Sequence, residues 1–308
     1  MTTTRTEPDR SSPSGIHRSR RARTAMWVWI LGGGLVIVIC SGAALLFAWM
    51  VDETHFDRPS AEFDELTGRL DSLSGVSDVE SNRWVEAPTF SNPTSWVGLS
   101  VNQDALPALL DAACTSAYPD AVTWSIRVHT ESGTTVALHG SGPASSGSGE
   151  RCADFGFEPV PLVAAIDRVV PGQSMQPAIW DDGRFALVAV DDGAGDAITD
   201  YRPLLPLVSS ADDLRRAGGL GGGPVEINAA TLGLTIGPRD AVRYVSLLDA
   251  LARNHAVSAF WVDAVGTTTD GVERVQLVAP EREHAAIARV IASSGLGIAE
   301  LPVRFLEP

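Results

Sequence analysis

The chain has 308 residues, of which 44 % are hydrophobic and 20 % are charged. This composition excludes a wholly disordered chain and leaves room for two or three domains. The formal net charge of −15 argues against nucleic acid as a partner of the bulk protein. The chain contains no Lys, which excludes any mechanism that needs a lysine base, a Schiff base or a phosphate-loop lysine.

The first residues differ in charge from the rest of the chain. Residues 1–25 hold six Arg against Glu7 and Asp9, a net charge of +4, which leaves −19 on the other residues. Residues 1–24 are polar, rich in Ser and lack apolar periodicity, so they predict a disordered, basic cytosolic tail.

A long apolar run follows this tail. From Ala25 to Val51 the only ionisable side chain is the thiol of Cys40, and the run is long enough to span a bilayer. We therefore expect a transmembrane helix over 25–51 and a short stalk over 52–59. A cleavable signal peptide ending near Ser41 is the alternative.

Basic residues before the run set its expected orientation. The positive-inside rule predicts a single-pass cell-membrane protein with a cytosolic N-terminus and an extracytoplasmic C-terminal region. The membrane is then one expected partner. The topology residues are Arg18, Arg20, Arg21 and Arg23.

Two cysteines, Cys114 and Cys152, lie outside the apolar run. In an oxidising compartment such a pair predicts a disulfide, here one that closes a loop of 38 residues. Metal binding by two lone cysteines so far apart is the weaker alternative.

Beyond residue 60, helix and strand signals recur in the order helix, strand, strand, helix, strand. Leu106, Leu109 and Leu110 follow helical spacing, for example, whereas Val122 to Val128 alternate with polar residues as a strand does. The first unit is predicted as helix 61–74, strands 76–86 and 95–101, helix 104–115 and strand 122–130. The second is helix 159–170, strands 176–181 and 185–191, helix 204–217 and strand 224–229. The third is helix 239–253, strands 256–263 and 272–279, helix 281–293 and strand 298–305.

This order resembles ferredoxin-like modules, in which a split βαββαβ unit packs two helices on one face of an antiparallel sheet. Residues 134–140 and 231–237 are candidate leading strands of the second and third units. The predicted fold class is α+β, with a transmembrane helix followed by tandem αββαβ modules. The predicted domains are modules at 60–140, 157–230 and 231–308, with a Gly/Ser linker at 141–156.

One motif resembles an enzyme family. Gly172–Pro177 (GQSMQP), with the following 182–188 (DGRFALV), is similar to the serine box of type I signal peptidases. The resemblance implies that Ser174 is a nucleophile. The bacterial members need a downstream lysine as the base, and this chain has none. We therefore expect no catalytic residues, with a serine hydrolase that uses Ser174 as the alternative.

Other motifs predict loops. The acidic stretch 191–196, with Asp200, is a candidate Ca²⁺ ligand set, but it lacks the register of a calcium loop. The glycine run 218–223 does not match a dinucleotide fingerprint and predicts a loop. No metal site and no cofactor is expected.

Five tryptophans lie on predicted strands beyond the apolar run. Trp124 belongs to the apolar side of its strand and predicts a core residue, whereas Trp96 falls on the side that the helices leave uncovered. Tryptophan is a favoured anchor in protein interfaces, so Trp96 is a candidate interface residue. The expected function is a non-catalytic, membrane-anchored envelope protein that contacts another protein or the cell wall. A binder of a small ligand or of Ca²⁺ is the further alternative.

Overall fold

The structure is a computed structural model that describes residues 55–86, 92–142, 152–190, 199–263 and 272–307. The chain divides into two units, residues 1–56 with 86–90 and residues 57–85 with 91–308. Of the first unit the structure describes only His55, Phe56 and Glu86. The fold below is that of the second unit.

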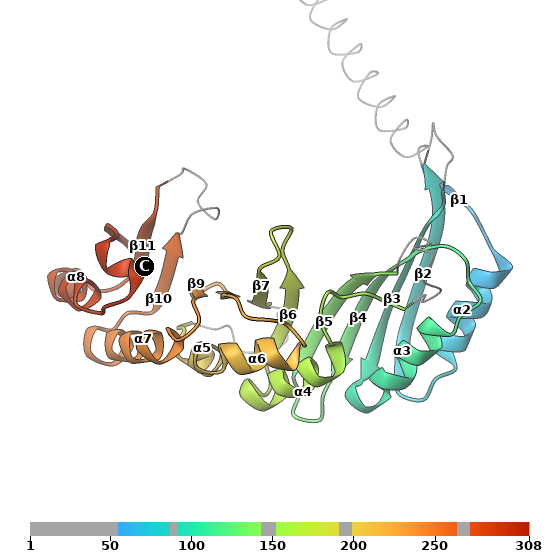
Figure 1. Ribbon diagram of the computed structural model, residues 1–308, viewed down its shortest axis with the longest axis horizontal. Coiled ribbons are helices and arrows are strands. Elements are labelled where there is room, and N and C mark those ends of the chain that lie inside the picture. The colour runs from blue at the N-terminus through green and yellow to red at the C-terminus, as the bar shows by residue number, and fades with distance from the viewer. Residues whose placement is uncertain (1–54, 87–91, 143–151, 191–198, 264–271, 308) are drawn as a thin grey trace, which may run out of the picture. The chain divides into compact units, whose positions relative to one another are not determined.

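Helices alternate with pairs of strands along most of the described chain (Figure 1). In chain order they are β1 (His55–Asp57), α2 (Ala61–Asp71), β2 (Val76–Glu86), β3 (Thr94–Asn102), η1 (Gln103–Ala105), α3 (Leu106–Cys114), β4 (Val122–His129), β5 (Thr135–Ser141), α4 (Pro159–Val169), β6 (Ser174–Ile179), β7 (Phe185–Ala189), η2 (Arg202–Leu204), α5 (Leu205–Ser209), α6 (Ala211–Ala217), β8 (Val225–Asn228), β9 (Leu232–Ile236), α7 (Ala241–His255), β10 (Ala259–Asp263), β11 (Arg274–Val278), η3 (Glu281–Glu283), α8 (His284–Ala292), η4 (Gly297–Glu300) and β12 (Val303–Leu306). Most of the helices and strands predicted beyond residue 60 are confirmed in position. The predicted helix 204–217 is instead divided into η2, α5 and α6, and the first part of the predicted strand 298–305 is the 3₁₀ helix η4.

Local sequence explains where the helices begin. Ser60 caps α2, because its side chain accepts a hydrogen bond from the backbone N–H of Phe63. Helices α3 and α4 carry proline in their first turn, where the missing N–H costs no hydrogen bond. Each helix turns a buried apolar stripe inward, such as Leu162, Val163 and Ile166 of α4.

The strands form one sheet in which neighbours in the chain are neighbours in space. Antiparallel hairpins (β2–β3, β4–β5, β6–β7, β8–β9 and β10–β11) alternate with parallel pairs. Each parallel pair is joined by a helical crossover, as in β3–α3–β4 and β5–α4–β6. The repeating unit is therefore a β-hairpin followed by helical structure.

The predicted fold class is correct as α+β and wrong in its strand order. In a split βαββαβ unit, the helical crossover skips a strand position, which another strand then fills. Here β3 pairs directly with β4, in parallel, along eight residue pairs. The sheet is accordingly mixed, not antiparallel, and its pairing runs without a break through β5–β6 and β9–β10.

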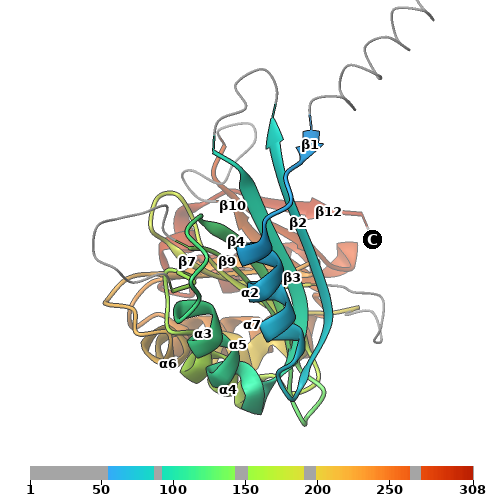
Figure 2. The same ribbon diagram turned by 90° about the vertical axis from the view of Figure 1, so that its right-hand side faces the viewer.

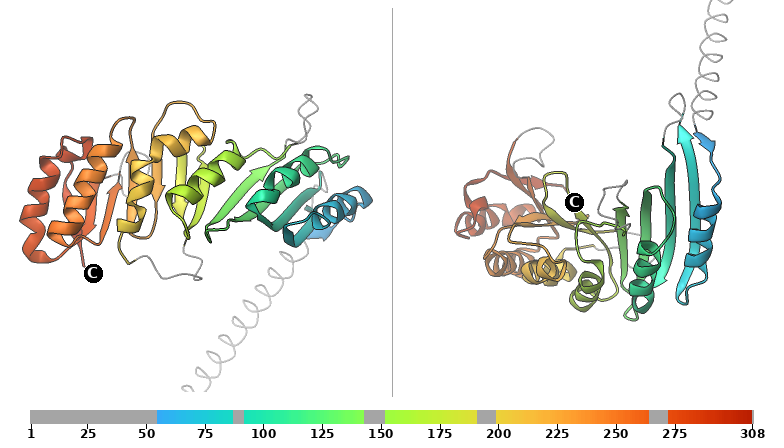
Figure 3. Two further views of the ribbon diagram at one scale, coloured as in Figure 1. Left: turned by 90° about the horizontal axis from the view of Figure 1, so that it is seen from below. Right: turned by 45° about the vertical axis from the view of Figure 1, so that its right-hand side comes forward.

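The helices of this unit cover one face of the sheet, which Figures 2 and 3 show from two sides. Strand residues alternate accordingly: Val122, Trp124, Ile126 and Val128 of β4 are buried beneath the helices, and the residues between them face away. The predicted core position of Trp124 is confirmed. No helix of the described ranges lies on the opposite face of the sheet (Figures 2 and 3).

The predicted membrane localisation is corrected. In the described residues, no helix is long and apolar enough to cross a membrane. The longest of the described helices, α7, has 15 residues, and a spanning helix needs about 20 apolar residues. The predicted tail 1–24, the predicted span 25–51 and the topology arginines Arg18, Arg20, Arg21 and Arg23 lie outside the described residues.

Candidate functional site

The face of the sheet that carries no helix is called the open face here. Residues paired in register on neighbouring strands point to the same side of a sheet. One row of such residues crosses β2 to β5, and a second crosses β6 to β12 on the same side. The first row is Asn82, Trp96, Thr123 and Ser141. The second is Gln176, Val188, Asn228, Gly233, Trp261, Gln276 and Arg304.

Three tryptophans occupy equivalent positions on the open face. Trp84 lies on β2 opposite Thr94, and Trp261 lies on β10 opposite Gln276. Trp180 directly follows β6, where its backbone N–H bonds to the carbonyl oxygen of Arg184 across the hairpin. Trp180 lies four residues after Gln176, so strand alternation places the two side chains on the same side of the sheet.

The three tryptophans also follow their preceding helices at nearly the same interval in the sequence. Each follows a fully buried residue of the preceding helix: Trp84 follows Leu70 by 14 residues, Trp180 follows Ile166 by 14, and Trp261 follows Leu248 by 13. The three helices (α2, α4 and α7) and the three hairpins are therefore structural repeats. Each repeat presents a tryptophan at this position on the open face, and the first repeat adds a second one, Trp96.

Glycines leave room for two of the indoles on this face. A Cβ added at Gly98 would lie 2.5 Å from Cη2 of Trp96, and one added at Gly233 would lie 2.7 Å from Cδ1 of Trp261. Both distances are too short for any side chain. The indoles of Trp96 and Trp261 thus lie along the sheet, over glycine backbone, and both residues are half-buried.

The open face is less acidic than the chain as a whole, because two of its carboxylates are paired with arginines and Arg304 lies on it too. Arg184 Nη1 lies 2.8 Å from Glu226 Oε2, and Arg274 Nε lies 3.0 Å from Asp263 Oδ2. Gln276 Nε2 donates a second hydrogen bond to Asp263, at 2.6 Å. Between these pairs the face presents mainly hydroxyl, amide and small side chains.

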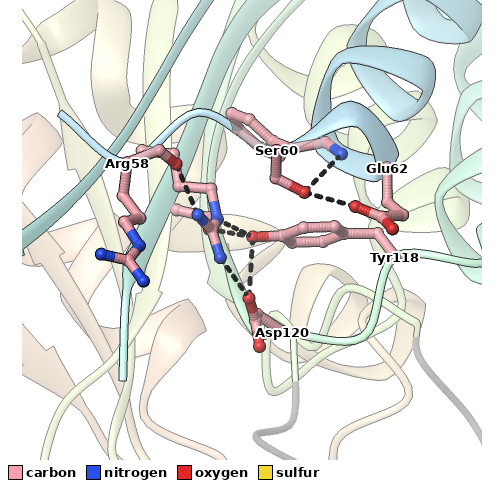
Figure 4. Close-up of polar contacts among 8 residues, drawn as sticks. Arg58, Ser60, Glu62, Tyr118 and Asp120 are labelled. Carbon is pink, nitrogen blue, oxygen red and sulfur yellow. Dashed lines mark hydrogen bonds and ion pairs between the residues drawn. The ribbon is translucent and has the colours of Figure 1, made fainter. Parts of the chain in front are cut away.

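A second polar cluster lies on the helix side of β2 and β3 (Figure 4). Tyr118 is buried, and its hydroxyl lies 2.5 Å from Ser95 Oγ and accepts a hydrogen bond from Arg83 Nε at 2.8 Å. Arg83 also donates through Nη2 to Asp120 Oδ2 at 2.9 Å. The cluster ties the segment after α3 to two strands, which is a structural role.

Next to this cluster, Figure 4 shows the beginning of α2. Ser60 Oγ donates a hydrogen bond to Glu62 Oε2 at 2.7 Å. This hydrogen bond lowers the pKa of the Glu62 carboxyl. An ionised carboxylate in the first turn of a helix interacts favourably with the helix dipole, so this contact helps to fix where α2 begins.

A cavity of about 910 Å³ opens beyond the carboxyl ends of the parallel strands β3 and β4. Its polar lining includes Asn102, His129, Glu131 and Asp167. Asp167 accepts hydrogen bonds from Thr130 Oγ1, at 2.6 Å, and from Ser132 Oγ. Burial alone would raise the pKa of Asp167, but hydrogen bonds from Ser132, Thr130 and Thr134 together lower it.

The predicted site residues fall in different places. The structure joins Cys114 and Cys152 in a disulfide, with their Cα atoms 4.1 Å apart. Trp96 lies on the open face, and its role in an interface stays a prediction. Ser174 begins β6, paired with Thr135.

The candidate Ca²⁺ ligands are only partly described. Residues 191–198 lie outside the described residues, and Asp200 makes an ion pair with Arg202 at 2.6 Å. Within the described ranges, no group of three or more His, Cys, Asp or Glu side chains could hold a metal ion.

Among the five tryptophans on predicted strands, sequence reasoning singled out only Trp124 and Trp96 and did not recognise Trp180 as a site residue. The signal that would have found it is the shared interval from the preceding helix, counted from Ile166. Comparison with protein-family models, with curated proteins and with solved structures gave no match to this chain.

Proposed function

We propose that this chain is a non-catalytic binding protein whose open face docks another protein. The observation that carries the proposal is that Trp84, Trp180 and Trp261 take equivalent positions in the three structural repeats, all on one continuous face that also carries Trp96. Successive members lie four strands apart in the sheet order. At the usual strand spacing this separation is about 19 Å along the sheet.

The chemistry of the open face favours a protein partner. Tryptophan and arginine are the residues that most often dominate binding energy in protein interfaces. Antibody binding loops also combine rigid aromatic anchors with small polar side chains. Trp180 is 38 % exposed and supplies such an anchor, while Asn228 on β8 and Thr235 on β9 supply adaptable hydrogen-bonding groups elsewhere on the same face.

Paired charges on the open face support the same proposal. A surface with a large uncompensated negative charge repels other acidic proteins. Because Arg184 and Arg274 offset Glu226 and Asp263, and Arg304 lies on the same face, the open face offers a partner a less negative surface than the net charge of the chain suggests.

The proposal is tested by affinity capture with matched variants of the full chain. The double variant Trp180→Ala/Trp261→Ala is compared with Val242→Ala, which removes an apolar side chain that is 77 % exposed on α7. We expect wild type and Val242→Ala to capture the same protein, and the tryptophan variant to lose it. Capture of the same protein by all three would contradict the proposal.

Two further outcomes would overturn it. Co-sedimentation of wild type, but not of the tryptophan variant, with an insoluble polysaccharide would assign the face to a glycan. Labelling of Ser174 by a fluorophosphonate probe would show an activated serine nucleophile and therefore an enzyme.

The cavity beside β3 and β4 favours a second candidate function, the binding of a small polar ligand. Ligands of open α/β sheets commonly bind beyond the carboxyl ends of strands. A thermal-shift screen of small amines tests this candidate. We expect a hit whose stabilisation is lost in His129→Ala, because His129 lines the cavity. If the ligand stabilised His129→Ala as much as wild type, the cavity would be excluded as its binding site.

A further inference from the structure

The side chain of Arg215 on α6 is buried without enough hydrogen-bond acceptors. It is 10 % exposed, and its Nη2 lies 3.2 Å from Asp212 Oδ1. Among the described residues, its Nε and Nη1 have no hydrogen-bond partner although both atoms are buried. A guanidinium stays charged at any ordinary pH, so α6 holds a buried cation with unused donors.

Burying these unpaired donors lowers the stability of the fold unless another group supplies the missing hydrogen-bond acceptors. Buried polar groups are hydrogen-bonded in nearly all cases, and each exception calls for a physical explanation. The next residue shows the ordinary alternative: Arg216 on the same helix is 69 % exposed and makes an ion pair with Asp213. The two neighbouring arginines of α6 therefore differ in burial, and only Arg215 lies on the buried side of the helix.

A glycine-rich loop covers the unused donors. Residues 218–223 connect α6 to β8 and contain five glycines, interrupted only by Leu220. Nη1 of Arg215 lies 4.0 Å from the position of an added Cβ at Gly223. At Gly221 and Gly222 an added Cβ would meet nothing within 4 Å. The guanidinium thus lies next to a loop in which only Leu220 carries a side chain, and the space above Gly221 and Gly222 is open.

We infer that Arg215 and the loop 218–223 form a binding site for a small oxyanion, a carboxylate or a phosphate group. An anion oxygen supplies the acceptor that Nη1 lacks, because guanidinium groups bind these anions through charge-assisted hydrogen bonds. Backbone N–H groups of a glycine-rich turn can add further donors to an anion. The loop has to move to admit the anion, and its glycines give it the conformational freedom to do so.

Two carboxylates face this region and limit what it accepts. Asp212 occupies Nη2, and an added Cβ at Gly219 would lie 2.9 Å from Glu158 Oε1. Both repel additional negative charge. The site therefore takes one anionic group at a time and excludes an extended polyanion. It is separate from the open face and does not depend on the function proposed for that face.

Thermal unfolding of the full chain in inorganic phosphate, sulfate or acetate tests the inference, with sodium chloride holding the ionic strength constant. We expect a rise of about 3 °C or more in Tm at an anion concentration ten times the Kd. Phosphate and acetate distinguish a phosphate ligand from a carboxylate ligand. No rise with any of the three anions would overturn the inference.

Matched variants locate the effect. Arg215→Met keeps the length of the side chain, removes the buried charge and is expected to abolish the rise, whereas Arg216→Met is expected to keep it. Gly222→Asp adds a carboxylate to the loop with Arg215 intact, and it should also abolish the rise. This second variant decides the matter if Arg215→Met does not fold. An undiminished rise in Gly222→Asp or in a folded Arg215→Met would contradict the inference.

Discussion

At the scale of single residues, the contact between Trp96 and Gly98 shows how the open face holds an aromatic ring. Because a Cβ at Gly98 would lie 2.5 Å from the indole, Gly98→Ala must displace Trp96. We expect a loss of about 1–3 kcal/mol in the free energy of unfolding, as in other overpacked sites. Urea unfolding measures the loss, and red-shifted tryptophan emission in the folded state reports the displaced ring.

Gly221→Ala is the matched control, because nothing lies within 4 Å of its added Cβ. We expect a change of no more than about 0.5 kcal/mol there. Equal losses at the two glycines would show that the Trp96 contact does not explain the effect at Gly98.

The buried hydroxyl of Tyr118 gives a second residue-scale prediction. Tyr118→Phe removes the partner of Ser95 and one acceptor of Arg83 but keeps the ring that packs against Phe63. We expect a loss of about 1–3 kcal/mol in stability, because it leaves buried polar groups unsatisfied. Chemical denaturation measures it. A variant as stable as wild type would mean that these hydrogen bonds contribute no net stability.

Asp167 gives a pH dependence. Its pKa in the folded state lies below the ordinary value of 3.8 because three hydroxyl groups hydrogen-bond to the carboxylate. The ionised group therefore stabilises the fold above the unfolded pKa, and this stabilisation is lost as the pH falls through the folded pKa. We expect Asp167→Asn to be less stable than wild type at neutral pH, with a difference that shrinks below pH 3.8.

Urea unfolding at a series of pH values measures this difference. Glu65→Gln, which neutralises an exposed carboxylate on α2, is the control and should show little change at any pH. If the difference between wild type and Asp167→Asn stayed constant as the pH fell, the assigned role of Asp167 would be wrong.

At the scale of elements, periodicity alone located the helices and strands. Amphipathic spacing identified α3 and α7, and strict alternation identified β4. Alternation in β6 places Trp180 on the same side as Gln176 and Ala178, but the sequence does not show which face of the sheet that side is. Its side of the sheet becomes visible only from the pairing of β6 with β7.

The disulfide links two elements and gives a prediction at this scale. Cys114 ends α3, and Cys152 precedes α4, at a separation of 38 in the sequence numbering. Replacing both by Ser should lower the stability by about 3–4 kcal/mol, because the unfolded chain regains the entropy of that loop. Urea unfolding of the variant, and of wild type with and without a reductant, measures the change. Equal stability of reduced and oxidised wild type would contradict it.

At the scale of the whole molecule, the strand order was beyond the reach of the sequence. A crossover helix can return the chain to the neighbouring position or skip one, and both choices satisfy the right-handed rule for parallel strands. The same helices and strands, correctly located, are therefore compatible with a ferredoxin-like unit and with the sequential sheet observed. The choice depends on contacts between strands, such as β5 with β6, which no local pattern encodes.

The strand order also determines the candidate site. Because the sheet continues through all three repeats, Trp84, Trp180 and Trp261 share one face and do not lie on three separate modules. A partner can then contact several of them at once, which raises the affinity through effective concentration.

Site-specific photo-cross-linking tests the central claim, that the open face is a binding surface, most directly. A photoreactive residue replaces Trp180 on the open face or Val242 on the helix layer, each in the full chain. The account predicts a discrete cross-linked protein from position 180, competed by unlabelled wild type, and none from position 242. Cross-links that form only at position 242, or equally at both positions, would contradict it.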